Sequence, residues 1–271
     1  MDLDSKNIQK QYEGFISTPV LWKEDLLGLS QLQLNTITTT IFDGELSKNT
    51  RLGKRVESFV SHYLQQFNDI TIVQENVQVQ REKLTIGELD CLYCHHDTPT
   101  HLEIIYKFYL YDAAVGSTEI DHWIGPNRND ALTKKLQKLI QQQLPLLYRE
   151  ETRSILDAVD FKLDDIQQKV YFKAQLFVPY KSKKITFEKL NNECIAGFYI
   201  KKEELHHLHD CKFHIPSKLN WLIQPQTNIN WLPFNNFEAA TTEILSNKIA
   251  PLCWLKKPNG ELQKFFIVWW S

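Results

Sequence analysis

Two strand-like segments separated by a short turn constrain the fold of this chain more than any other feature. Residues 84–94 and 102–110 are rich in aliphatic, aromatic and β-branched side chains, and only a short segment containing Pro99 separates them. So short a connection favours antiparallel pairing of the two segments as a β-hairpin. We therefore expect this hairpin to belong to the core sheet of the protein.

Charged residues alternate with apolar ones along the expected hairpin. Because the side chains of a strand point alternately to its two faces, Glu88 and Asp90 are expected on one face of the first strand. By the same argument, His101, Glu103 and Lys107 share a face of the second strand. Charges in a core sheet are costly unless they meet partners or a metal. Two carboxylates could hold Mg²⁺ or Mn²⁺ beside a lysine that stabilises phosphate charge, or the four groups could form a purely structural ion-pair network.

Helical and strand-like segments surround the hairpin. An apolar stripe predicts a helix over residues 56–67, alternation predicts a strand over residues 70–80, and residues 43–45 and 47–50 are turn-prone. The stripe of a second helix consists of Leu132, Leu136, Leu139, Ile140 and Leu147. The order helix, three strands, helix is typical of a compact α/β or α+β core.

The second half of the chain is richer in strand-like segments. These are residues 170–179, 194–200, 221–224 and 265–270. A length of 271 residues suits one large domain or two modest ones. We expect an α/β core over residues 1–150, and a β-rich part over residues 151–271 that either packs on that core or folds independently.

Composition excludes several classes of protein. The chain has 31 basic and 33 acidic residues, and its net charge of −2 excludes a general polycation while leaving room for a local basic groove. No segment approaches the roughly 18 apolar residues that span a bilayer, and the first residues lack the apolar stretch of a secretory signal. Five cysteines without an export signal indicate reduced thiols, so we expect a cytoplasmic protein with no membrane partner.

Short motifs on the expected elements resemble those of known families. Glu57 on a helix, Asp90 on a strand, Glu103 and a lysine on the next strand, and a following helix resemble the layout of the PD-(D/E)XK nuclease superfamily. A closer resemblance is to a bacterial family known only as a domain of unknown function, DUF1853. That resemblance rests on Ile-Gly-Glu-Leu-Asp at 86–90, Glu103 with Lys-Phe-Tyr-Leu at 107–110, Gly-Pro-Asn-Arg-Asn-Asp at 125–130, Lys135-Leu136 with Gln143, and Trp-Leu-Pro at 231–233.

The resemblance implies a restriction-endonuclease-like core, with a central mixed sheet flanked by helices. It implies that Asp90 and Glu103 bind Mg²⁺ or Mn²⁺ and that Glu57 assists, although Glu57 equally suits a solvated helix glutamate. The superfamily spacing would place the catalytic lysine at position 105, which is Ile105 here. Lys107 lies on the same face but about 13 Å from Glu103 along a regular strand, so a bulge or a long side chain would have to shorten that distance.

Basic residues accompany the second helix, and they could line a groove for nucleic acid or form its solvated face. They are Arg128, Lys134, Lys135 and Lys138, and Arg51, Lys54 and Arg55 near the first helix could line the same groove. Lys135 is also the alternative source of the missing catalytic lysine. Gln143, on the core-facing side of the helix, either touches the site or is a buried amide with a backbone partner. The sequence thus favours either a metal-dependent nuclease that hydrolyses phosphodiester bonds or a degenerate module that keeps the fold and binds nucleic acid or protein.

Two other clusters contain potential metal ligands. Cys91, Cys94 and His95 have the spacing of a c-type haem attachment site, but a strand points the two cysteines to opposite faces, so no haem is expected. A second cluster offers donors suited to Zn²⁺ in an expected exposed loop or helix end. It consists of His206, His207, His209, Cys211 and His214.

Overall fold

A computed structural model describes residues 3–34, 41–46, 51–182 and 185–270, so the turn predicted at residues 47–50 lies outside the described part. The chain forms two compact units, each discontinuous in sequence. The hairpin unit comprises residues 20–106 and 134–173, and the terminal unit comprises residues 1–19, 107–133 and 174–271. Each unit contains residues from both sides of position 150. The domain boundary expected there stays a prediction.

The hairpin unit is built on an antiparallel meander of three strands. These are β3 (Ile70–Arg81), β4 (Leu84–His95) and β5 (Thr98–Tyr111), whose last residues belong to the terminal unit. His95 pairs with Thr98, so the β4–β5 turn contains only two residues and the predicted hairpin is confirmed. The hydrogen-bonded neighbour of β5 is β7 (Gln167–Pro179), and a separate short ribbon joins β1 (Asp25–Leu26) to β2 (Leu29–Ser30).

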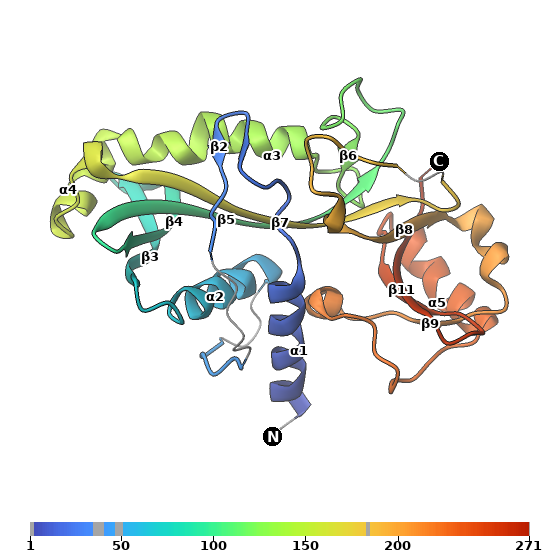
Figure 1. Ribbon diagram of the computed structural model, residues 1–271. Helices are drawn as coiled ribbons and strands as arrows, with labels where there is room; N and C mark the ends of the chain where they lie inside the picture. The colour runs from blue at the N-terminus through green and yellow to red at the C-terminus, as the bar shows by residue number, and fades with distance from the viewer. Residues whose placement is uncertain (1–2, 35–40, 47–50, 183–184, 271) are drawn as a thin grey trace. The chain divides into compact units, whose positions relative to one another are not determined.

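Helices cover both faces of the meander in this unit (Figure 1). Helix α2 (Leu52–Leu64) lies on one face and buries Val56, Phe59 and Val60. The other face carries a continuous helical run of α3 (Leu132–Lys138), the π-helix η1 (Leu139–Gln143) and the 3₁₀ helix η2 (Leu144–Tyr148), followed by α4 (Glu150–Ala158). Leu146, Leu147 and Leu156 of this run form an apolar cluster with strand residues that include Leu89 and Leu92. Both helices predicted around the hairpin are therefore present.

The terminal unit contains a mixed sheet. Strand β8 (Ile195–Lys201) pairs in parallel with β7 and with β11 (Leu262–Val268), whereas β10 (Leu252–Lys256) pairs antiparallel with β11 and β9 (Lys212–His214). Short strand β6 (Trp123–Ile124) pairs with β5. Two α-helices and three 3₁₀ helices complete the terminal unit: α1 (Leu3–Ser17), α5 (Phe234–Ser246), η4 (Asn192–Cys194), η5 (Lys202–Leu208) and η6 (Lys218–Leu222). A further 3₁₀ helix, η3 (Leu163–Asp165), belongs to the hairpin unit.

The predicted class, α/β with a mixed sheet and flanking helices, is confirmed. The strand predicted at residues 221–224 is wrong, because Trp221 and Leu222 end the 3₁₀ helix η6. Trp221 packs edge-to-face on Phe108 and Phe266, so its apolar character reflects packing and not strand pairing. None of the described helices has the length and apolar character needed to cross a membrane.

Candidate functional site

The candidate site begins where strand β4 loses its regular pairing at Asp90. On the β3 side, Asn76 stands between the paired residues Glu75 and Val77 and has a φ of 54°. On the β5 side, the paired register ends at Cys91. The register between β3 and β4 continues across this position without an extra residue, so the left-handed backbone of Asn76, which is uncommon in a strand, interrupts the pairing without a bulge.

This irregularity lets the Asp90 carboxylate take the place of a backbone acceptor. Its Oδ2 accepts a hydrogen bond of 2.8 Å from the backbone N–H of Ile104 on β5. Glu88, two residues earlier, instead accepts from Lys54 on α2 at 2.5 Å. Regular alternation predicts a common face for Asp90 and Glu88, and the two carboxylates have different hydrogen-bond partners.

Glu103 on β5 is fully buried, and both of its carboxylate oxygens accept hydrogen bonds. His101 Nε2 lies 3.2 Å from Oε1, and the amide nitrogen of Gln143 donates to Oε2. The amide oxygen of Gln143 in turn accepts from the ammonium of Lys135 at 2.7 Å. The side-chain amide of Gln143 therefore connects the buried carboxylate of Glu103 to the half-buried ammonium of Lys135 by hydrogen bonds.

The protonation of His101 follows from its partners. The amide nitrogen of Gln168 lies 3.0 Å from His101 Nδ1 and donates to the carbonyl oxygen of Leu144 at 2.8 Å. The carbonyl oxygen of Leu144 can only accept, so the Gln168 atom that contacts it must be the amide nitrogen. The same nitrogen therefore donates to His101 Nδ1. The proton of the neutral imidazole is then on Nε2, which donates to Glu103. Burial lowers the pKa of His101 to about 4, so the imidazole is neutral at pH 7.

The π-helical turn explains how Lys135 and Gln143 reach each other. They are eight residues apart, which is about 2.2 turns of a regular α-helix, so their side chains would diverge. A π-turn closes i to i+5 and contains more residues per turn, which reduces the excess rotation. The π-helix covers Leu139–Gln143, between the two side chains, and thereby brings them to the same side of the helix.

A second group of charges lies beside α2. The ammonium of Lys54 contacts Glu57 at 2.8 Å, Glu88 at 2.5 Å and the side-chain oxygen of Asn76 at 2.8 Å. Burial opposes the charge of Lys54, but its hydrogen bonds and ion pairs with Glu57 and Glu88 outweigh burial and raise its pKa. Lys54 thus links α2 to β3 through Asn76 and to β4 through Glu88.

Burial disfavours the ionised forms of Asp90 and Glu103. Burial, the charge of Glu103 and that of Glu57 raise the pKa of Asp90 to about 7, against the lowering effects of the Ile104 N–H and Lys135. Burial also raises the pKa of Glu103 to about 7, although Lys135 and Lys138 oppose it. Carboxylates with pKa values raised in this way are typical of functional sites, although structural networks also produce them.

The predicted lysine and arginine outside this group have partners of their own within the terminal unit. Lys107 forms an ion pair with Asp130 at 2.6 Å, and Arg128 pairs with Asp112 at 2.8 Å. The Arg128 guanidinium also lies over the Trp270 ring, 4.8 Å from its centroid. On the helical run, Lys134 and Lys138 are exposed and Lys135 is half-buried. Of these cations, Lys135 is the one that contacts the hydrogen-bond network of Glu103.

The donors at Asp90 and Glu103 suit a hard divalent cation. Their ligand atoms are carboxylate oxygens, which Mg²⁺ and Mn²⁺ prefer. Burial raises the pKa of both groups first, and a bound cation would favour their ionised forms. Among the described residues, Asp90, Glu103 and Glu57 do not bring three ligand atoms within 4.8 Å of one another. Mg²⁺ commonly uses one or two carboxylates and keeps several waters, so a two-carboxylate site is consistent with this spacing.

The predicted histidine cluster does not converge. The ring nitrogens of His206, His209 and His214 instead contact backbone carbonyls of Glu203, His206 and Asn230. Within the part of the chain that the structure describes, the three-residue set of ligand atoms within 4.8 Å is Asp69, His95 and His96.

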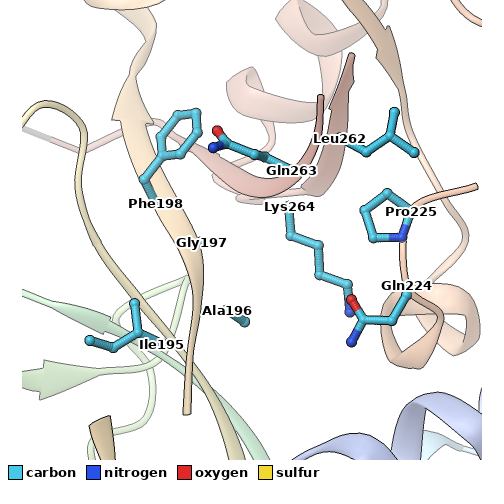
Figure 2. Close-up of a pocket in the computed structure, with 9 residues that line it drawn as sticks. All are labelled: Ile195, Ala196, Gly197, Phe198, Gln224, Pro225, Leu262, Gln263 and Lys264. Atoms are coloured by element: carbon cyan, nitrogen blue, oxygen red, sulfur yellow. The ribbon is translucent and has the colours of Figure 1, made fainter. Parts of the chain in front are cut away.

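A separate pocket of about 380 Å³ lies in the terminal unit, between β8, β11 and Gln224 (Figure 2). Lys264 points into this region but is only 2% exposed. Its ammonium donates to Gln175 Oε1 and to the carbonyls of Trp221 and Leu222 at 2.9, 2.9 and 3.5 Å. These three hydrogen bonds direct the Lys264 ammonium to oxygens of the protein itself.

Comparison with known proteins identifies the family. The family model described as Domain of unknown function (DUF1853) matches residues 26–268. The chain belongs to this family. No curated protein and no solved structure matched the chain. Every element of the hairpin unit from β2 onward lies within the DUF1853 match, so the candidate site is part of the family domain.

Sequence reasoning did not predict the contacts of several site residues in this DUF1853 protein. Lys54 was named only as one basic residue of a possible groove, and no local signal indicates its contacts with Glu88 and Asn76. Gln168 reaches His101 across 67 positions of sequence, which no motif reveals. The alternation of strand side chains placed His101 on the face of Glu103, but it indicated no hydrogen-bond partner for the imidazole.

Proposed function

We propose that this protein is a metal-dependent phosphodiester hydrolase, a nuclease related to the PD-(D/E)XK superfamily with a restriction-endonuclease-like core. The observation that carries the proposal is the pair Asp90 and Glu103 on neighbouring strands, placed at a break in the sheet beside Lys135. Asp90 and Glu103 would hold Mg²⁺ or Mn²⁺, with Glu57 assisting through its negative charge. When bound, the ion would supply Lewis-acid polarisation of the phosphodiester and a water of lowered pKa.

The chain's own residues have distinct roles in this proposal. His101 and Gln143 orient the Glu103 carboxylate by donating to its two oxygens. Lys135 supplies the positive charge near the phosphate in place of the lysine missing at Ile105. Lys134 and Lys138 lie exposed on the same helix and would contact the nucleic-acid backbone, where each contact adds affinity through counterion release.

A cleavage assay with matched variants tests the proposal. Labelled single-stranded DNA, double-stranded DNA and RNA are incubated with the wild type in Mg²⁺ or Mn²⁺, and with Asp90→Asn and Lys135→Met. Both substitutions should lower the rate by roughly 10²–10³, as removal of one transition-state electrostatic group does elsewhere. The neighbouring exposed substitution Lys134→Met should change the rate only through affinity. Wild-type activity in Asp90→Asn would refute the assignment.

A second candidate is a non-catalytic module that keeps the fold and binds nucleic acid or protein. Two observations favour it: both oxygens of Glu103 are occupied by His101 and Gln143, and Lys107 pairs with Asp130. Calorimetric titration with Mn²⁺ separates the two candidates. A hydrolase should show binding that Asp90→Asn removes, whereas a degenerate module should bind nucleic acid with no such metal dependence.

A further inference from the structure

Two consecutive histidines converge on one carboxylate at the turn of the β4–β5 hairpin. His95 Nε2 lies 3.1 Å from Asp69 Oδ2, and His96 Nε2 lies 3.5 Å from the same oxygen. The two imidazole rings are nearly parallel, with centroids 5.0 Å apart and planes inclined by 14°. Neighbouring strand residues normally point to opposite faces, so this convergence depends on the turn.

The backbone of the turn fixes this arrangement. His96 is the first of the two turn residues and has a φ of 51°, which swings its side chain to the side of His95. Its backbone N–H donates to the carbonyl oxygen of Asp69 at 2.7 Å. His95 itself is paired with Ile70, the residue after Asp69, in the β3–β4 register. Asp69 is therefore attached to the hairpin end through both its backbone and its side chain.

The two distances from Asp69 to the histidine nitrogens match those of a tetrahedral transition-metal site. Bonds of about 2.0–2.1 Å at tetrahedral angles place neighbouring ligand atoms about 3.3 Å apart. The two distances to Asp69 Oδ2, 3.1 and 3.5 Å, lie on either side of that value, and all three ligand atoms lie within 4.8 Å. Two imidazoles and one carboxylate are a ligand set that Zn²⁺ accepts while leaving a fourth position for water.

We propose that Asp69, His95 and His96 bind a transition-metal ion of the Zn²⁺ class at the tip of the β4–β5 hairpin. Imidazole nitrogens favour Zn²⁺ over Mg²⁺, so this site differs in chemistry from the all-oxygen group at Asp90 and Glu103. The ion would join the α2–β3 connection to the hairpin turn. The proposal does not depend on the function proposed above.

Calorimetric titration of the metal-free protein with Zn²⁺ tests the site, with Co²⁺ absorption as a second readout of tetrahedral nitrogen and oxygen ligation. We expect one ion per chain at this site. Loss of outer-sphere partners alone weakens metal sites by about 10–100-fold, so removal of a direct ligand in Asp69→Asn, His95→Ala or His96→Asn should weaken binding at least tenfold. His96→Asn is the most conservative of these, since Asn tolerates a positive φ.

Matched controls distinguish this site from others. His206→Ala combined with His207→Ala removes two other adjacent histidines, and Asp90→Asn removes the predicted Mg²⁺ ligand; neither should change Zn²⁺ affinity. Zinc should also raise the unfolding temperature of the wild type but not of His96→Asn. The proposal is overturned if the wild type binds no Zn²⁺, if the three ligand variants bind it normally, or if the His206 and His207 substitutions abolish binding.

Discussion

The substitution Asp90→Asn should make the protein more stable at neutral and alkaline pH while removing the proposed activity. The introduced asparagine side chain has the same shape as aspartate, and its oxygen can still accept from the N–H of Ile104. What disappears is a carboxylate whose ionised form the folded protein disfavours, through burial and the nearby Glu103 and Glu57 charges. A carboxylate held only as part of a stabilising ion-pair network would give the opposite result.

The magnitude follows from the pKa of Asp90, which rises from 3.8 to about 7 on folding. Below pH 3.8 the carboxylate is protonated in both states, so the two proteins should be equally stable. As pH rises toward 7, the unfolded chain ionises first and wild-type stability falls. The full shift corresponds to about 4 kcal/mol, and solvent screening of this partly exposed side chain reduces the expected gain in Asp90→Asn to about 2–3 kcal/mol.

Urea unfolding in metal-free buffer at pH 4 and pH 8 measures this difference. The control is Asp157→Asn, an exposed position on α4, which should stay within about 0.5 kcal/mol of the wild type at both pH values. The reasoning is refuted if Asp90→Asn is less stable than the wild type at pH 8, or if its advantage does not grow between the two pH values.

Three further predictions concern other charged residues. The double substitution Lys134→Ala and Lys138→Ala should reduce the slope of log affinity against log salt concentration for double-stranded DNA by about 2. Fluorescence anisotropy measures this affinity, and an unchanged slope would show that neither lysine contacts the DNA backbone. Burial lowers the pKa of Lys264 to about 7, below its unfolded value of 10.5, so the unfolded chain binds more protons between these values. Wild-type stability should therefore rise from pH 7 to pH 10 relative to Lys264→Met, and parallel denaturation profiles would contradict this. Arg128→Ala should lower the free energy of unfolding by about 1 kcal/mol, because it removes the contacts with Asp112 and Trp270. The control is Lys181→Ala, which removes a cation that lies near an aromatic ring and has no acidic partner among its described contacts. Thermal unfolding of both variants should show the smaller loss of stability in Lys181→Ala.

The hairpin could be predicted from sequence because its information is local. Strand periodicity and a short turn determine the pairing of β4 with β5, and this pairing brings Asp90 near Glu103. The spacing of apolar residues likewise predicted both flanking helices, which bury most of the side chains that define the stripes. These parts of the fold need no knowledge of distant contacts.

The details of the site depend on features that local sequence does not encode. The positive φ of Asn76 lies in a segment that otherwise alternates like any strand, and the π-turn at Leu139–Gln143 has no distinguishing composition. The contact between Gln168 and His101 joins residues from distant strands. The incorrect prediction of a strand at residues 221–224 also reflects contacts between distant residues. Trp221 packs on Phe108 and Phe266, and local sequence does not distinguish such packing from strand pairing.

The most direct test of the proposed site is anomalous diffraction from crystals of the wild type soaked in MnCl₂. The proposal predicts a manganese peak at about 2.1–2.2 Å from oxygens of both Asp90 and Glu103, with the Lys135 ammonium on the same side of the sheet. A peak that contacts neither carboxylate, or no peak between them at full soak, would contradict the assignment of Asp90 and Glu103 as a metal centre.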